Sequence, residues 1–125
     1  MKREGSLSKG FTLIEIMIVV AIIGLLAAIA IPNFVHARTN SQQNACINNL
    51  RQIDGAKQTW ALDNKVSPTS TPAASLIQLY MGRGTGGALP FCPADTGSTF
   101  SSSYSINDLQ SPPTCQIVPT LHIYN

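Results

Sequence analysis

The sequence has few charged residues, and one long stretch has none at all. Charged side chains make up 11% of the 125 residues. The formal charge of +2 comes from Lys2, Arg3 and Lys9 against Glu4, because the bases and acids of residues 11–125 balance. A broadly basic surface that would bind nucleic acid is therefore excluded, and no nucleic-acid partner is expected.

Sequence patterns for catalysis or metal binding are also missing. The serines of residues 98–105 lie in no G-x-S-x-G pattern, and His36 and His122 lack the paired spacing of metal ligands. Asp95 and Asp108 do not have the spacing of an EF-hand loop. We therefore predict no catalytic residue, no metal site and no cofactor.

Residues 16–31 contain no charged or strongly polar side chain. With the residues before it, this run approaches the roughly 20 residues that a membrane-spanning helix needs. The bases before the run should stay in the cytoplasm, which sends the chain after Pro32 to the other side. A secretory signal peptide has a similar pattern, and residues 28–30 match its A-x-A cleavage site. Composition alone supports both interpretations.

Glu15 separates these interpretations, because it places a carboxylate near the start of the apolar run. An acid at the centre of a spanning helix costs about 2.5–3.5 kcal/mol on translocon scales, and less near an end. The carboxylate must therefore reach the cytoplasmic interface or meet a positive group. A position at the cytoplasmic interface requires no particular function of Glu15, whereas pairing with a positive group does.

The stretch KGFTLIE, residues 9–15, and the apolar run after it resemble the leader and N-terminal segment of type IV pilins and type II secretion pseudopilins. The resemblance covers residues 1–34. It implies that a prepilin peptidase cuts between Gly10 and Phe11 and methylates the new amino group of Phe11. It also implies that Glu15 pairs with that amino group, in its own subunit or a neighbour, and so selects the register of assembly.

The resemblance implies a structural filament subunit that is not an enzyme. Its parts would be a cleaved cytoplasmic leader at residues 1–10, a transmembrane and assembly helix at 11–33, and a periplasmic globular domain at 34–125. Its partners would be copies of itself in a helical filament, the prepilin peptidase, an assembly ATPase with its inner-membrane platform, and membrane lipid. The short body favours a pseudopilin-like subunit over an adhesive pilin. The alternative is a membrane-anchored periplasmic binding or hydrolytic domain with an unprocessed anchor.

Helical periodicity continues beyond the anchor. Apolar residues recur at steps of three and four residues, and this predicts one helix from Phe11 to about Asp63. The buried stripe should contain Cys46, Leu50, Ile53, Ala56 or Lys57, and Trp60. Pro32 should kink or loosen this helix and belongs to the segment expected to assemble. A second, short helix is expected from Thr71 and Pro72 to Tyr80, closed by Gly82.

The last part of the chain predicts a small antiparallel sheet that packs on the long helix, and therefore an α+β fold. Residues 100–106 alternate as one strand, and Cys115 begins a second. Cys92 and Cys115 flank this sheet in an expected oxidising compartment, which predicts a disulfide that contributes about 3 kcal/mol. Cys46 lies on the buried stripe and is expected to be a reduced core thiol.

Overall fold

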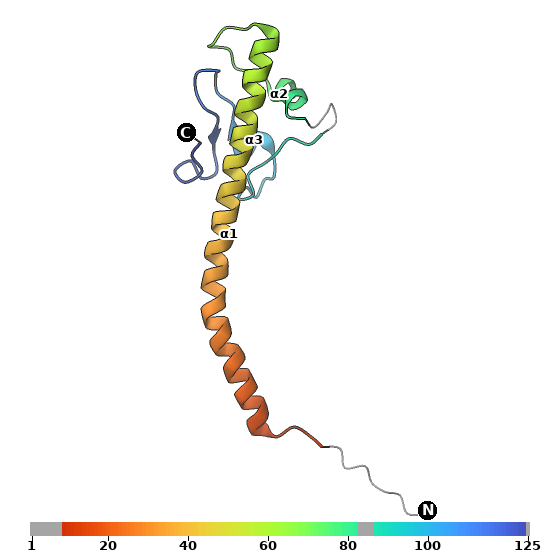
Figure 1. The fold of residues 1–125 in the computed structure, drawn as a ribbon, viewed down its shortest axis with the longest axis vertical. Helices are drawn as coiled ribbons and strands as arrows, with labels where there is room; N and C mark the ends of the chain where they lie inside the picture. Colours follow the sequence, from red (N-terminus) through yellow and green to blue (C-terminus); the bar gives the residue numbers. More distant parts are fainter. Residues whose placement is uncertain (1–8, 83–86, 125) are drawn as a thin grey trace, which may run out of the picture. The chain divides into compact units, whose positions relative to one another are not determined.

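The structure is a computed structural model that describes residues 9–82 and 87–124. Its elements are helix α1 (Leu13–Asn64), helix α2 (Ala74–Tyr80), helix α3 (Phe100–Ser103), strand β1 (Tyr104–Ser105) and strand β2 (Thr114–Cys115) (Figure 1). This confirms the predicted α+β fold with a long N-terminal helix and a small antiparallel sheet. Most of the predicted leader, residues 1–8, lies outside the described residues. The chain forms two compact units, residues 1–37 and 38–125.

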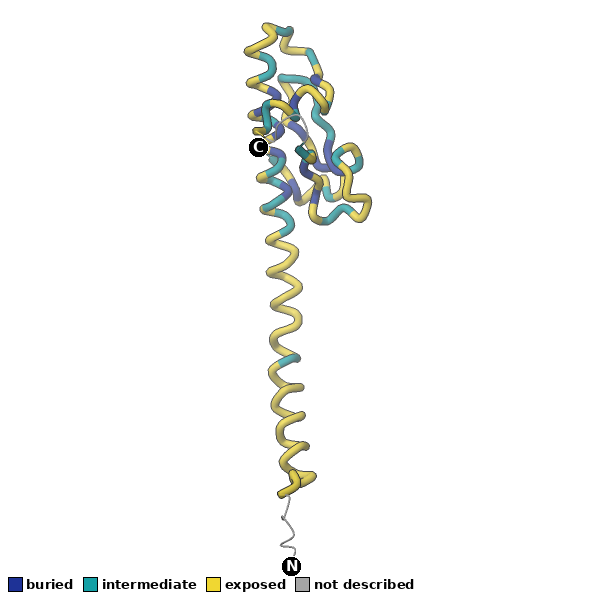
Figure 2. The backbone as a smooth tube through the Cα atoms, turned by 90° about the vertical axis from the view of Figure 1, so that its right-hand side faces the viewer, coloured by how far each residue is buried: buried dark blue, intermediate teal, exposed yellow. Residues whose placement is uncertain are grey.

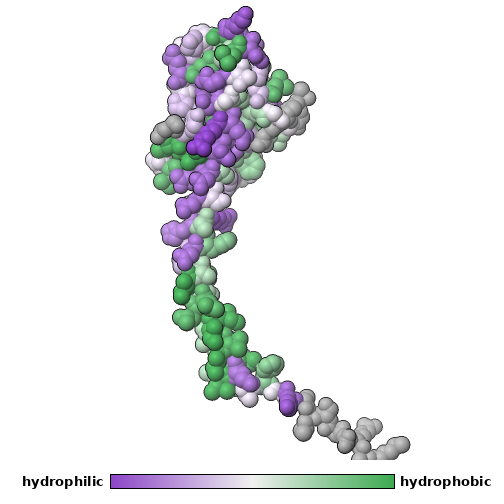
Figure 3. Space-filling view, in the orientation of Figure 1, coloured by the Kyte–Doolittle hydropathy of each residue, from purple (hydrophilic) through white to green (hydrophobic). Residues whose placement is uncertain are grey.

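The first unit contains the N-terminal part of α1. From residue 9 to residue 37 every side chain is exposed except that of the half-buried Ala27 (Figure 2). On the face seen in Figure 3, apolar side chains make up most of this part of the helix. Among the described helices, α1 is long and apolar enough to cross a membrane. It continues through Pro32, although a proline cannot donate the usual hydrogen bond to the preceding turn.

The second unit has its core against the C-terminal half of α1. Its buried apolar residues are Cys46, Leu50, Ile53, Ala56, Ile77, Cys92, Tyr104 and Cys115. The predicted stripe on α1 is therefore confirmed from Cys46 to Ala56. Trp60 is only half-buried, so the stripe weakens near the end of the helix.

The predicted start of α2 is wrong, whereas its predicted end at Tyr80 is confirmed. Ala73, not Thr71, is the N-cap residue, because the N–H groups of Leu76 and Ile77 donate to the Ala73 carbonyl at 3.0 and 3.3 Å. Gly82 follows the helix with φ of +69°, in the left-handed region that glycine adopts most easily after a helix.

The strand predicted over residues 100–106 is also wrong for its first four residues, which form α3. The Thr99 hydroxyl caps this helix by accepting a hydrogen bond from the Ser102 N–H at 3.3 Å. Asp95 accepts a hydrogen bond from the Ser103 hydroxyl at 2.7 Å. These local side-chain bonds outweigh the alternating pattern. Within residues 9–82 and 87–124, the sheet consists of the pairs Tyr104 with Cys115 and Ser105 with Thr114.

Lys57 is fully buried on α1 and supports the connection between β1 and β2. Its Nζ donates hydrogen bonds to the carbonyl oxygens of Ile106, Asp108 and Ser111, at 3.2, 2.8 and 2.7 Å. The carboxylate of Asp54 lies 3.5 Å away on the same helix. Burial lowers the pKa of Lys57, while the nearby carboxylate opposes that shift. A charged residue is thus tolerated in the core because its donors are satisfied.

Candidate functional site at the start of α1

The first turn of α1 is closed by a reciprocal pair of side chains. The Thr12 backbone N–H donates to Glu15 Oε2 at 2.7 Å, and the Thr12 hydroxyl donates to the same oxygen at 2.9 Å. In return, the Glu15 N–H lies 3.3 Å from the Thr12 hydroxyl oxygen. Because α1 begins at Leu13, Thr12 is at the N-cap position and Glu15 at the third helical position. This arrangement is a capping box, which satisfies N–H groups that the helix itself leaves without partners.

The cap gives Glu15 a local role within the single chain. Its carboxylate lies at the positive end of the helix dipole, where an anion is stabilised. The carboxylate is also exposed, because it caps the helix from the outside. A positive group that approaches the helix start from another molecule would therefore find Glu15 accessible.

The predicted cleavage position lies directly before this cap. Gly10 and Phe11 precede the helix, and both are exposed, Phe11 to 85%. A side chain added at Gly10 would meet no atom within 4 Å. The folded chain itself thus places no steric demand for glycine there. Pro32 lies several turns further along α1 and is not brought near Gly10, Phe11 or Glu15.

Sequence reasoning identified Glu15 but missed Thr12. The missed signal is the pattern T-x-x-E immediately before an apolar run, which is typical of a capping box. The structure adds that the acid near the start of the apolar helix already has hydrogen-bond donors in the single chain. The location of this acid therefore does not require a partner molecule.

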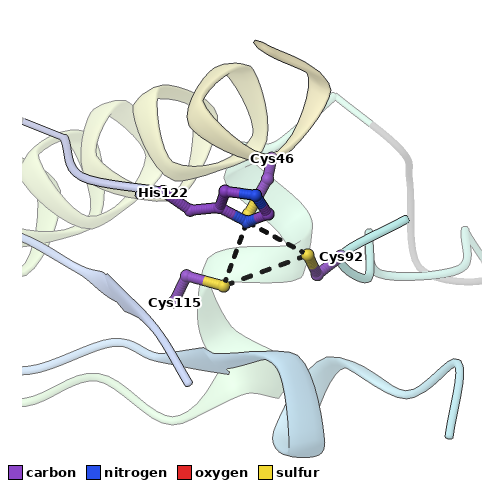
Figure 4. Close-up of side chains that lie close together, drawn as sticks. All are labelled: Cys46, Cys92, Cys115 and His122. Atoms are coloured by element: carbon purple, nitrogen blue, oxygen red, sulfur yellow. Dashed lines mark hydrogen bonds between the residues drawn. The ribbon is translucent and has the colours of Figure 1, made fainter. Parts of the chain in front are cut away.

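The predicted disulfide residues belong to a second cluster of side chains, within the second unit. The Sγ atoms of Cys92 and Cys115 lie 3.9 Å apart, and all three cysteines are free thiols in the structure. Nδ1 of His122 lies 3.5 Å from Cys92 Sγ and 3.6 Å from Cys115 Sγ (Figure 4). Cys46 completes the group from α1. Cys46 lies in the core, as predicted, whereas its reduced state and the Cys92–Cys115 bond stay predictions.

These four residues could hold a metal ion, which the sequence analysis did not foresee. Their ligand atoms all lie within 4.8 Å of one another, and all four residues are buried. Burial raises the pKa of the Cys46 and Cys92 thiols and lowers that of His122. No sequence signal pairs His122 with the cysteines, because the four ligands come from separate segments without a repeated spacing.

Comparison with known proteins addresses the N-terminal segment directly. Residues 5–31 match the family model of the prokaryotic N-terminal methylation motif. The chain is 53% identical over 53 residues to the type IV major pilin protein PilA of Myxococcus xanthus. That match covers 42% of this chain and 24% of the pilin. No solved structure matches the chain significantly.

Relatives from two kinds of filament system match. The chain is 53% identical over 60 residues to the type IV major fimbrial protein FimA of Dichelobacter nodosus, covering 48% of this chain and 38% of FimA. It is 36% identical over 62 residues to the type II secretion system core protein G of Klebsiella pneumoniae, covering 50% of this chain and 44% of that protein. The chain thus spans less than half the length of these curated relatives.

Among the described residues, the fold has one helix that is long and apolar enough to cross a membrane, together with a small α+β body. The motif and the relatives support a more particular assignment, to the type IV pilins and type II secretion pseudopilins. The recognition made from residues 9–15 and the apolar run is thereby confirmed.

Proposed function

We propose that this chain is a structural subunit of a type IV pilus-like or type II secretion pseudopilus filament. A prepilin peptidase would remove residues 1–10 and methylate Phe11, and an assembly ATPase with its inner-membrane platform would then add the subunit to the filament. The observation that carries this proposal is the exposed, apolar start of α1 with Glu15 at its first turn. The similarity to filament proteins in the matched stretch supports it.

The exposed apolar surface of residues 11–35 would be covered by lipid before assembly and by other subunits after it. In a single subunit this surface would be covered by lipid, with the short leader on the cytoplasmic side. In a filament the same surface would be covered by the helices of neighbouring subunits. Assembly then exchanges lipid contacts for protein contacts, and the apolar side chains are compatible with both.

Glu15 would give this assembly its register. Cleavage after Gly10 would create an α-ammonium group on Phe11. This group would lie next to the Thr12 N–H, which already donates a hydrogen bond to the Glu15 carboxylate. In a bundle of staggered helices, the carboxylate of one subunit could meet the ammonium group of another away from water. Breaking a buried charge pair costs several kcal/mol, so a register that leaves Glu15 without its partner would be disfavoured.

Mass spectrometry of the mature N-terminus tests this function against an unprocessed, membrane-anchored binding or hydrolytic domain. The filament subunit should begin at Phe11 with one methyl group on its α-amino nitrogen. An intact Met1 in the functional, membrane-inserted protein would contradict the proposal.

Loss of the gene in the native cell distinguishes the two filament types. A pseudopilus subunit should be needed for protein secretion, and a pilus subunit for surface filaments. The small body favours the pseudopilus, whereas the relatives include proteins of both systems.

A further inference from the structure

The four residues Cys46, Cys92, Cys115 and His122 form the centre of the core of the second unit. Cys46 and Cys92 are 0% exposed, Cys115 is 2% exposed and His122 is 4% exposed. They come from α1, from the segment before α3, from β2 and from the C-terminal turn (Figure 4). The cluster therefore joins four segments, of which β2 takes part in the described two-residue strand pair with β1.

We propose that these residues bind one structural Zn²⁺ ion through three thiolates and the Nδ1 atom of His122. The proposal goes beyond filament assembly and does not depend on it. Three cysteines and one histidine are a ligand set of closed structural zinc sites, in which no coordination position is left for water. The set is also poorly suited to calcium or magnesium, which prefer oxygen ligands.

The distances between the ligand atoms fit a tetrahedral ion. With Zn–S bonds of about 2.3 Å and a Zn–N bond of about 2.0–2.1 Å, tetrahedral angles give S···S distances of about 3.8 Å and S···N distances of about 3.6 Å. The corresponding distances are 3.9 Å between Cys92 and Cys115, and 3.5 and 3.6 Å from these sulfurs to His122 Nδ1. Cys46 Sγ lies within 4.8 Å of the other ligand atoms. This upper limit exceeds the tetrahedral S···S distance by about 1 Å.

Groups around the ligands are placed to stabilise thiolates. Tyr104 lowers the pKa of Cys46, against the larger effect of burial. Asn49 Nδ2 donates a hydrogen bond to the Tyr104 hydroxyl oxygen at 3.0 Å. The backbone of Ala94 likewise lowers the pKa of Cys92, against the larger effect of burial. Such outer contacts orient metal ligands and tune their basicity. In binding the ion, each thiol would release its proton to solvent.

A disulfide between Cys92 and Cys115 would explain the positions of fewer of these four side chains than a zinc ion does. It would use two of the four converging groups, and the buried Nδ1 of His122 would then face sulfur atoms that are poor hydrogen-bond partners. An S–S bond also requires about 2.0 Å between sulfurs that lie 3.9 Å apart. Disulfide and zinc site use the same sulfurs and exclude each other.

A bound zinc ion would stabilise the second unit. The second unit has few buried apolar side chains, and three of them are the cysteines themselves. Small domains with little core commonly depend on a metal or on disulfides for stability. A zinc ion would tie the C-terminal turn and β2 to α1, in place of the larger sheet that this unit lacks among its described residues.

The first experiment uses the full-length protein, purified in detergent without chelator and without added metal. Elemental mass spectrometry should find about one zinc per chain. After chelation and unfolding without reductant, all three thiols should react with an alkylating reagent. Replacing zinc by Co²⁺ should give the intense visible bands of tetrahedral coordination and a sulfur-to-cobalt charge-transfer band. Metal-free protein with a single reactive thiol would overturn the proposal in favour of the disulfide.

Variants identify the ligands. Cys46→Ala should reduce zinc retention and the charge-transfer intensity, because Cys46 is a proposed ligand. A Cys92–Cys115 disulfide, in contrast, would not involve Cys46. Tyr104→Phe should keep one bound metal but weaken affinity by about 10–100-fold, as loss of an outer contact typically does. His36→Ala changes an exposed histidine and is the matched control, which should bind zinc like the original protein.

Equal zinc retention by Cys46→Ala and the original protein would place the metal elsewhere and contradict the proposal. If Cys46→Ala fails to fold, the metal content and the thiol count of the unaltered protein still decide between zinc and a disulfide. Failure of these tests leaves N-terminal processing untouched, since that is measured at Phe11.

Discussion

Thr12 and Glu15 cap the first turn of α1 reciprocally, with the Thr12 N–H 2.7 Å from Glu15 Oε2 and the Glu15 N–H 3.3 Å from the Thr12 hydroxyl oxygen. The carboxylate therefore has two possible roles that can be separated by mutation. One is to start the helix, which requires Thr12 as well. The other is to meet the α-ammonium group of a neighbouring subunit, which requires only Glu15.

Glu15→Leu should leave membrane insertion intact while filament growth fails. The substitution removes the one charge from the apolar run, so insertion becomes no more costly. It also removes the proposed partner of the Phe11 ammonium group. Membrane fractionation and electron microscopy of filaments measure the two outcomes separately.

Thr12→Val is the matched control for Glu15→Leu. It keeps the carboxylate and removes the hydroxyl of the cap, at a cost of about 1 kcal/mol to the helix start. Filaments should still form, because the charge remains. Filaments of normal length from Glu15→Leu would show that the carboxylate serves only as a cap.

Gly10→Val should block removal of the leader. A side chain at Gly10 meets no atom within 4 Å, so the subunit should tolerate it, and the defect would arise in the peptidase site. Electrophoresis and mass spectrometry should show the uncut precursor. Gly24→Val, at another glycine with no atom within 4 Å, should be cut normally. A mature-sized Gly10→Val product would argue against cleavage at this bond.

The long helix could be predicted because one physical pattern repeats along it. An uninterrupted apolar run and then apolar residues at steps of three and four specify a helix without knowledge of the rest of the chain. The prediction of Phe11 to about Asp63 differs from the observed Leu13–Asn64 by two residues at most. The buried stripe from Cys46 to Ala56 follows from the same periodicity.

The C-terminal region could not be predicted in the same way, because long-range contacts and local side-chain bonds decide it. Thr99 caps a helix where alternation had predicted a strand. His122 reaches Cys92 and Cys115 only through the path of the chain, which no spacing in the sequence encodes. The two clusters thus differ. Thr12 and Glu15 are close in sequence and form the recognisable pattern T-x-x-E, whereas the residues of the cysteine–histidine cluster are far apart in sequence and form no such pattern.

Lys57→Met should destabilise the second unit by about 3 kcal/mol. Methionine fills similar volume but donates no hydrogen bond, so three carbonyl oxygens around Lys57 Nζ would lose a buried donor. Denaturant unfolding of the full chain in detergent, followed by circular dichroism, measures the loss. Lys65→Met, at an exposed position near the end of α1, should change stability by less than about 0.5 kcal/mol. Equal effects of the two variants would contradict a structural role for Lys57.

Asp108 should make the stability of the second unit depend on pH in the acid range. Its Oδ1 accepts a hydrogen bond from the Ser111 N–H at 2.8 Å. Hydrogen bonds from Ser111, with a smaller contribution from the charge of Lys57, hold the pKa of Asp108 below its ordinary value of 3.8. The unfolded chain therefore takes up this proton at a higher pH than the folded chain. The stabilisation is full above pH 3.8 and is lost as the pH falls through the lowered folded-state value.

Asp108→Asn isolates this contribution, because asparagine keeps an acceptor oxygen for Ser111 but cannot ionise. The original protein should be more stable than the variant near neutral pH, and the difference should shrink below pH 3.8. Metal content should be measured at each pH, since acid also releases metals from thiolates. Asp63→Asn removes an exposed carboxylate and controls for the change in net charge. A stability difference that stays constant into the acid range would show that Asp108 acts through its shape and not through its charge.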